Sequence, residues 1–363
     1  MMIPKPRPER WTSCLTGSPR WKQKKATGRQ LIMGKAAMRE IIEKFDSGEK
    51  WVILCHENPD GDTIGCGLAL YSLGKRLGKN VRIMGRDPLP SRYWFLPYYN
   101  DFECCKEIRG DDVKDALLIC VDTSTAARSM PGLKEVLSYA DSINIDHHGD
   151  NHLYCRLNLV DPDASASAEI ITDLLTEGGW GIEKREAICL YTGLSTDNGN
   201  PRFGTTTARS HLCAARLLEA GVEPAIIDEY VNENMTPEIL KLWGVAYTRT
   251  EIFSNGSGAL FWLRKEDFTS AGADSSAVDG LVNVLLRITG VRVALFLTEV
   301  NGENKVSIRT KAPYSARDIA SAFGGGGHLQ AAGAKIEGNF CDVIDSVKSE
   351  AEKYIHDRTF AAK

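Results

Sequence analysis

The 363-residue chain lacks any hydrophobic run long enough to form a membrane-spanning helix. Such a helix needs roughly 18 or more consecutive apolar residues, whereas the apolar segments here are short and separated by charged or turn-forming residues. With 43% hydrophobic and 25% charged residues, the composition is that of a globular protein with enough apolar side chain to build a core. We therefore expect no membrane partner and a cytoplasmic location.

The chain also lacks a C-x-x-C pair, although it contains ten cysteines. Cys55, Cys120, Cys189 and Cys213 lie within apolar segments, where buried thiols are common. No pair has the spacing of a zinc finger or a redox motif. The pattern favours a reducing compartment over a disulfide framework.

Acidic residues are almost absent from the first 32 positions. This segment contains Glu9 against eight lysines and arginines, so it carries a net charge of +7. Since the whole chain has a formal charge of −4, the remainder carries −11. We predict that residues 1–32 form a basic, disordered extension. An acidic body argues against binding of long nucleic acids, which usually requires an extended basic surface.

The length predicts two domains, and the first shows short apolar strands alternating with helical patterns. Strands are predicted at residues 51–55, 80–84, 116–121 and 142–145, and helices at 63–77, 167–178, 184–195 and 205–220. Such alternation is typical of an α/β fold with a parallel sheet and helices on both faces. We assign this domain to residues 33–223.

Residues 224–255 have helical patterns and no strand signal, so we predict a helical connector there. Residues 256–363 then form a smaller α/β domain with a mixed sheet. Its strands are predicted at 259–264, 291–300, 305–311 and 332–336, and its helices at 277–288, 316–323 and 342–355. The cleft between two such bodies is a common ligand site.

Metal-ligand residues gather at the ends of apolar runs. The segment WVILCHENPDGD, residues 51–62, leads from a predicted strand into a turn with one histidine and two aspartates. Three later runs, LLICVD, INIDHH and LYTGLSTD, also end in Asp or His. These four expected strand ends supply His56, Asp60, Asp62, Asp122, Asp146, His147, His148 and Asp197. Function in open α/β sheets collects at the carboxyl ends of strands, so we interpret the pattern as one polynuclear metal site.

Two histidines and four aspartates suit a dinuclear centre. We assign His56 and Asp60 to one ion, Asp62, His147 and Asp197 to the other, and Asp122 as the bridge. Four carboxylates balance the charge of two divalent cations. Carboxylate-rich ligation favours Mn²⁺ or Mg²⁺, and the imidazoles favour Mn²⁺, with other divalent ions as alternatives. Such a pair of ions is typical of phosphate ester hydrolysis. A lone aspartate at a strand end is more often a cap or turn residue, so the interpretation depends on all four runs together.

The C-terminal domain contains a candidate phosphate-binding region. In KVSIRTK, residues 305–311, apolar side chains alternate with polar ones, so Arg309 lies on the face opposite the core. A glycine tetrad with a histidine follows, comprising Gly324, Gly325, Gly326, Gly327 and His328. The tetrad could be a plain linker, but successive glycine amides can also form an anion-binding nest. We predict that these residues and Arg309 bind a substrate phosphate.

The chain resembles the DHH phosphoesterase family with its DHH-associated C-terminal domain. The resemblance is carried by an ordered set of motifs: HENPDGD, VDTS, IDHH, STDNG, KVSIRT and GGGGHLQAAGA. The resemblance runs from Met33 onward and is strongest to the nanoRNase and pAp-phosphatase branch. It implies that the six assigned ligands bind Mn²⁺ and that His148 contacts the scissile phosphate and protonates the leaving oxygen. It further implies that Asp146 orients the histidines and that Arg128 approaches substrate phosphate. Cys66 and Asn198 depart from the family pattern without removing a ligand.

The resemblance implies a metal-dependent phosphodiesterase that hydrolyses short oligoribonucleotides to 5′-mononucleotides and also dephosphorylates pAp. Expected partners are short single-stranded oligonucleotides, pAp or cyclic dinucleotides, and the sequence leaves open whether two copies form a homodimer. Hydrolysis of cyclic di-AMP or pApA is an alternative within the same chemistry, and inorganic pyrophosphate is another substrate for such a site. A nucleotide sensor without turnover is an alternative of a different class.

Overall fold

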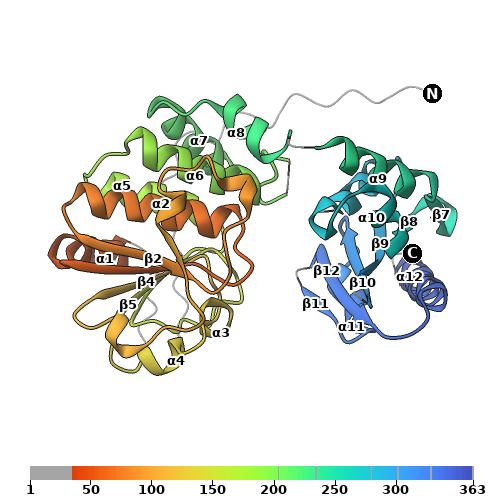
Figure 1. Ribbon diagram of the computed structural model, residues 1–363, viewed down its shortest axis with the longest axis horizontal. Helices are drawn as coiled ribbons and strands as arrows, with labels where there is room; N and C mark the ends of the chain where they lie inside the picture. The colour runs from red at the N-terminus through yellow and green to blue at the C-terminus, as the bar shows by residue number, and fades with distance from the viewer. Residues whose placement is uncertain are drawn as a thin grey trace. The chain divides into compact units, whose positions relative to one another are not determined.

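The computed structural model describes residues 35–361, apart from positions 203, 234, 279, 301 and 328. The predicted extension at residues 1–32 and His328 of the glycine motif lie outside these described residues. The chain divides into two compact units, Met1–Asn234 and Met235–Lys363 (Figure 1). This division falls inside the segment expected to connect the domains, because helix α8 (Pro224–Val231) belongs to the first unit and α9 (Pro237–Thr248) to the second.

The first unit contains a six-stranded parallel sheet in the order β3-β2-β1-β4-β5-β6. The strands are β1 (Lys50–Leu54), β2 (Asn80–Gly85), β3 (Phe102–Cys104), β4 (Leu117–Val121), β5 (Asp141–Asp146) and β6 (Leu157–Val160). The predicted parallel sheet is confirmed, while β3 and β6 were not predicted. Since all neighbours are parallel, the carboxyl ends of the strands meet at one edge.

Helices cover both faces of this sheet, as predicted. They are α1 (Lys35–Ser47), α2 (Gly61–Arg76), α3 (Ala126–Ser129), α4 (Leu133–Val136), α5 (Ser167–Glu177), α6 (Lys184–Asp197), α7 (Ala208–Glu219) and α8. Figure 1 shows α2, α5 and α6 along one face and the short helices α3 and α4 along the other. A hydrophobic core lies on each face of the sheet, and alternate residues of β1 point into one or the other. Trp51 and Ile53 belong to the larger core, and Val52 and Leu54 belong to the smaller one. Strands buried on both faces are therefore hydrophobic throughout.

Helices α2 and α6 pack closely through glycines. A Cβ atom added at Gly65 would lie 2.3 Å from the carbonyl oxygen of Cys189, and one at Gly61 would lie 2.3 Å from Oγ1 of Thr196. A Cβ atom at Gly193 would lie 2.8 Å from Oδ1 of Asp62. This contact places the N-terminus of α2 beside the C-terminal end of α6.

One expectation about these elements was wrong. The run LYTGLSTD was counted as a fourth strand end, but Asp197 is the last residue of helix α6, which instead confirms the helix predicted at residues 184–195. A short apolar run cannot be assigned to a strand or a buried helix from its pattern alone. Asp197 reaches the carboxyl edge of the sheet because α6 runs antiparallel to α2.

The second unit has a mixed six-stranded sheet in the order β11-β12-β10-β9-β8-β7, which confirms the prediction. The strands are β7 (Glu251–Phe253), β8 (Gly258–Leu263), β9 (Val293–Val300), β10 (Glu303–Thr310), β11 (Gly326–Gly327) and β12 (Ala331–Ile336). Strands β8 and β9 are parallel and the other pairs are antiparallel. Besides α9, the α-helices in its described part are α10 (Lys265–Ala271), α11 (Ala316–Ser321) and α12 (Phe340–Ala361).

Two details of this unit differ from the predictions. The α-helix expected at residues 277–288 is wrong, because Ser275–Val278 and Leu281–Arg287 form 3₁₀ helices and Gly280 between them has φ of +75°. That conformation suits glycine and ends a helix. The expected absence of a strand before residue 255 is also wrong, since β7 pairs with β8. Its three residues are too few to show a period of two.

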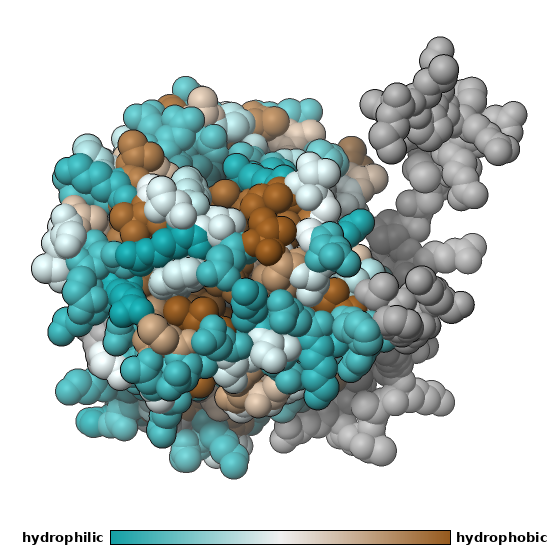
Figure 2. Space-filling model, turned by 90° about the vertical axis from the view of Figure 1, so that its right-hand side faces the viewer, coloured by the Kyte–Doolittle hydropathy of each residue, from teal (hydrophilic) through white to brown (hydrophobic). Residues whose placement is uncertain are grey.

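None of the described helices is both long and apolar enough to cross a membrane. Figure 2 shows one face of the molecule, on which hydrophilic residues predominate and hydrophobic residues form patches of limited extent.

The α2–α6 contact predicts that Gly65→Ala destabilises the first unit, because the added methyl group must push against the Cys189 backbone. Overpacking of this kind costs about 1–3 kcal/mol. Urea denaturation followed by circular dichroism measures the effect. Gly204→Ala is the control, since a Cβ atom there meets nothing within 4 Å. Equal unfolding free energies for the two variants would contradict the close packing.

Candidate metal centre

The turn after β1 presents the first group of candidate ligands. His56 is buried, and its Nδ1 lies 2.7 Å from the carbonyl oxygen of Glu57. With Nδ1 donating to this carbonyl, Nε2 keeps a free lone pair for a cation. Nε2 lies 3.5 Å from Oδ1 of Asp60 and 3.5 Å from Oδ2 of Asp122. Asp60 also caps helix α2 by accepting from the amides of Asp62 and Thr63.

A second group lies where the ends of α2, β5 and α6 meet, and it comprises Asp62, His147 and Asp197. Nε2 of His147 lies 3.4 Å from Oδ2 of Asp197, while its Nδ1 lies 3.3 Å from the carbonyl oxygen of Ala164. The ligand atoms of each group lie within 4.8 Å of one another. Both groups could therefore each surround one cation.

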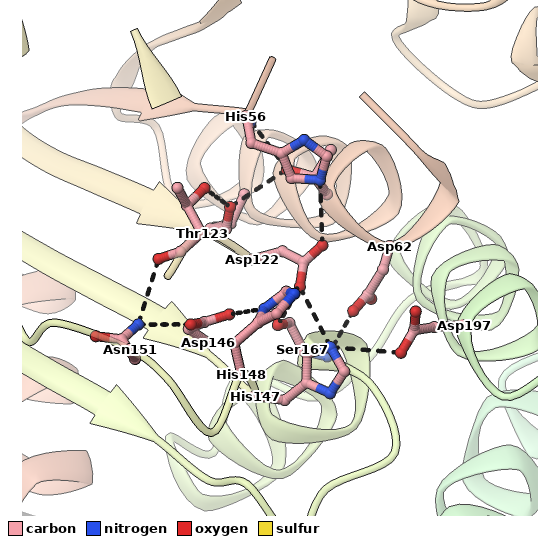
Figure 3. Close-up of polar contacts among 12 residues, drawn as sticks. His56, Asp62, Asp122, Thr123, Asp146, His147, His148, Asn151, Ser167 and Asp197 are labelled. Atoms are coloured by element: carbon pink, nitrogen blue, oxygen red, sulfur yellow. Dashed lines mark hydrogen bonds and ion pairs between the residues drawn. The ribbon is translucent and has the colours of Figure 1, made fainter. Parts of the chain in front are cut away.

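Asp122 lies between the two groups (Figure 3). Its Oδ2 faces His56, and its Oδ1 lies 3.6 Å from Nε2 of His147. The residue follows the central strand β4, is 2% exposed, and has φ of +54°. A single carboxylate is thus presented to both groups, and the combination of carboxylates and imidazoles fits divalent cations.

His148 is held beside the cluster by a chain of hydrogen bonds. Its Nδ1 lies 2.8 Å from Oδ1 of Asp146, a fully buried carboxylate at the end of β5. Asn151 donates to the other oxygen of Asp146 at 2.5 Å. The Nδ1 of His148 also lies 3.8 Å from Oδ1 of Asp122. Asp146 therefore fixes the orientation of the His148 ring (Figure 3), whereas no hydrogen bond joins Asp146 to His147 among the described contacts.

The contribution of the turn that precedes α5 was not predicted from the sequence. Ser167 donates through its hydroxyl to Asp122 at 2.8 Å and through its amide to Asp62 at 2.6 Å. The amide of Ala168 donates to the other oxygen of Asp62 at 3.0 Å, and the carbonyl of Ala164 accepts from His147. The only signal in the sequence is a run of small residues before a helix, which has no metal-ligand pattern.

An arginine on α7 holds this turn in place. Arg209 forms ion pairs with Asp161 at 2.5 Å, Glu169 at 3.1 Å and Asp173 at 2.9 Å. Glu169 in turn accepts from the hydroxyl of Ser165. Burial would lower the pKa of Arg209, but these carboxylates raise it. The guanidinium thus remains charged and fixes the segment that contacts three candidate ligands.

The cluster is strained by like charges in its metal-free form. Burial raises the pKa of Asp62 well above its usual value, and the Asp122 and Asp197 carboxylates raise it further. Burial likewise raises the pKa of Asp197 to about 7. Burial would lower the pKa of His56, but hydrogen bonding to Asp122 and Asp60 raises it to about 10. Protons on these groups therefore offset the negative charge that divalent cations would otherwise neutralise.

The remaining predicted residues lie apart from this cluster or in the second unit. Arg128, on α3, is exposed, and its carbonyl accepts from the amide of Glu57 at 2.7 Å, next to His56. Arg309 lies on β10 and is half-buried, and its Nη1 donates to the carbonyl of Ile308. No carboxylate of the described residues forms an ion pair with Arg309. Burial without such a partner lowers its pKa.

The glycine tetrad is more ordered than a linker. The amides of Gly324 and Gly325 donate to carbonyls of α11, while Gly326 and Gly327 form β11 beside β12. A Cβ atom at Gly325 would lie 2.2 Å from the carbonyl oxygen of Gly333. Glycine is therefore required by close backbone approach, and two of the four amides are already used by the helix.

Comparison with known proteins gives matches to both units. The DHH family, N-terminal domain, matches residues 50–194, and the DHHA1 domain matches residues 259–357. The bifunctional oligoribonuclease and PAP phosphatase NrnA of Thermus thermophilus is 33% identical over 86% of this chain and 94% of its own. The protein of the same description from Bacillus subtilis is 28% identical over 82% of this chain and 92% of its own.

A solved structure has the same fold. The crystal structure of an exopolyphosphatase-related protein from Bacteroides fragilis matches with a TM-score of 0.84 and 26% identity, over 90% of this chain and 98% of that one.

Ser167→Ala should weaken metal binding, because Asp122 loses a hydrogen bond that fixes its direction. Removal of such an outer partner typically costs 10- to 100-fold in affinity. Isothermal titration calorimetry with MnCl₂ measures the change. Ser138→Ala, on an exposed turn, serves as the control. Unchanged affinity in Ser167→Ala would show that the hydroxyl does not position the ligand.

The raised pKa values predict that the metal-free protein loses stability as pH rises. A raised pKa favours the protonated form in the folded state, so the contribution of Asp197 is lost as pH rises through about 7. The contributions of His56 and His147, with pKa values of about 10 and 9, weaken above their usual 6.5.

Melting temperatures of EDTA-treated protein at pH 5 and pH 8 check this sign. We expect the lower value at pH 8 and a smaller difference with excess Mg²⁺, because metal ligation favours deprotonated ligands. A higher melting temperature at pH 8 in EDTA would contradict the charge balance described here.

Proposed function

Because the chain belongs to the DHH family, we propose that it hydrolyses short single-stranded oligoribonucleotides to 5′-mononucleotides and also removes the 3′-phosphate of pAp. Its broader class is a hydrolase of phosphoester bonds. The observation that carries the proposal is the Asp122 carboxylate, whose two oxygens face the two ligand groups. The names of the NrnA relatives support the choice of substrates.

Two divalent cations fit the donor set. His56 and Asp60 would hold one, Asp62, His147 and Asp197 would hold the other, and Asp122 would contact both. We propose Mn²⁺, since imidazole ligands favour it over Mg²⁺. When bound, the cations would supply Lewis-acid activation of a water nucleophile and charge neutralisation at the phosphoryl group.

His148 is proposed to contact the scissile phosphate and to protonate the leaving oxygen. Burial would lower its pKa, but the hydrogen bond from Nδ1 to Asp146 raises it and so favours the protonated ring that a proton donor needs. The same bond directs Nε2 away from Asp146. Arg128, exposed near the turn that contains His56, is proposed to bind substrate phosphate.

Residues 256–363, which belong to the second unit, are proposed as the substrate-binding domain, and residues 33–223 as the catalytic domain. By strand register, Arg309 lies opposite Ala331, and Ser307 lies opposite Gly333, which pairs with Gly326. These positions share one face of the sheet, and the small side chains leave room beside the guanidinium. A cation without a carboxylate partner suits a phosphate, and the glycine tetrad with His328 completes the proposed site.

A product time course tests the function. The substrates are 5′-labelled oligoribonucleotides of two to ten nucleotides, pAp, cyclic di-AMP and inorganic pyrophosphate, each with Mn²⁺ or Mg²⁺. We expect mononucleotide release from the shortest oligonucleotides and phosphate release from pAp, with weak activity on pyrophosphate. Binding of these nucleotides without any product would instead indicate a sensor.

Asp122→Asn should lower kcat by at least about 100-fold, because the amide keeps the shape of the side chain but loses the charge presented to both ligand groups. This loss exceeds the effect of removing a residue that only hydrogen-bonds to a ligand. The melting temperature in EDTA should not fall, since a repelling carboxylate is removed. Asp141→Asn, which affects an ion pair with Lys44 at the opposite end of β5, is the control. Near-normal turnover in Asp122→Asn would exclude the shared role.

A further inference from the structure

Trp94, Phe95 and Tyr230 form an aromatic cluster outside the proposed metal centre. Trp94 follows the 3₁₀ helix Ser91–Tyr93 in the segment after β2, and its side chain is 60% exposed. Its ring meets Tyr230 of α8 edge to face, with centroids 5.4 Å apart and an interplanar angle of 82°. Phe95 stacks on the same tyrosine at 4.8 Å and 15°.

The cluster is a rigid support. Phe95 packs against the larger core of the first unit, and Tyr230 lies between it and Trp94. The Trp94 ring is thus held from one side by an aromatic contact while most of its surface stays open. Such an arrangement costs little conformational entropy when a second flat ring stacks on it.

One side of the cluster is connected to the turn that contains His56 and Asp60. Arg86 pairs with Glu57 at 3.0 Å, and the side chain of Asp87 accepts from the amide of Asn58 at 2.8 Å. Residues 86 and 87 directly follow β2, so the segment that contains Trp94 starts beside the candidate ligands.

The other side is connected to the turn after Asp197. Asn200 donates to Asp228 of α8 at 3.2 Å, and its amide donates to the carbonyl of Ser195 at 2.8 Å. Helix α8, with Tyr230, is therefore joined to the end of α6. The segment after β2 and helix α8, which together carry the aromatic cluster, are therefore both connected to the carboxyl edge of the sheet, where the candidate ligands lie.

We infer that Trp94 is a stacking platform for one base of the substrate, at the rim of the proposed metal centre. This inference rests on the proposed function, because it needs a single-stranded oligonucleotide whose backbone reaches the ligands. Base stacking on an exposed aromatic ring contributes to affinity for every base, since each base has a π-face. The platform therefore favours oligonucleotides over phosphate esters without bases and is indifferent to sequence.

An abasic scan combined with substitution of Trp94 tests the inference. The substrates are pentaadenylate and five versions of it, each with one abasic residue, and KM and kcat are measured for the full chain with Mn²⁺. Trp94→Ala should raise KM for pentaadenylate at least about 5-fold, with kcat within about 2-fold. Trp94→Tyr should restore most of the affinity, and Tyr139→Ala, which removes another exposed aromatic ring, should have no effect.

The decisive result is non-additivity. One abasic position should raise KM for the wild-type protein and leave KM of Trp94→Ala unchanged, because deleting the base and deleting the ring each remove the same stacking interaction. Equal KM values for wild type and Trp94→Ala would overturn the platform and leave the proposed function intact. A wild-type protein inactive on every oligonucleotide would overturn both. Loss of a dimer in sedimentation of Trp94→Ala, with KM unchanged, would make the ring a subunit contact instead.

Discussion

The repulsion among four aspartates that converge at one edge of a parallel sheet is the constraint on which the first unit depends. Asp62 and Asp122 are almost fully buried, so each negative charge there requires a compensating donor or cation. Backbone amides at the start of α5 donate to Asp62, and the Ser167 hydroxyl donates to Asp122. Each of the two ligand groups also contains one histidine, His56 in the first and His147 in the second. Divalent cations would complete this compensation.

The scaffold around the carboxylates follows from this need. The central strands β1 and β4 end next to one another, which brings His56 and Asp122 together. The glycine contact between α2 and α6 adds Asp62 and Asp197 from two helices that run in opposite directions. Arg209 holds the turn before α5 through three carboxylates. Rigidity thus comes from helix and sheet packing, because exposed loops alone would let the aspartates separate.

Much of this arrangement was predictable, because it depends on local patterns. Apolar runs followed by Asp or His identified strands β1, β4 and β5 and the six candidate ligands, and the structure brings these side chains together. The role of Ser167 was missed, since its contacts with Asp62 and Asp122 join residues over 40 positions apart. The helix that ends at Asp197 was predicted, but the run before Asp197 was also counted as a strand end, because the place of this residue at the sheet edge depends on how α6 packs against α2. Tertiary contacts of this kind leave no periodic signal in the sequence.

Charge explains why a site of this kind suits short substrates. The chain after residue 32 carries −11, so most of its surface repels a polyanion. Attraction for a phosphate must then come from local groups, such as the cations that the aspartates would hold and Arg309. Salt screens charges beyond about 10 Å, so an oligonucleotide of a few residues gains these local attractions without placing many phosphates against acidic surface. Each added nucleotide brings another phosphate, so the repulsion from the net negative chain grows with the length of the substrate.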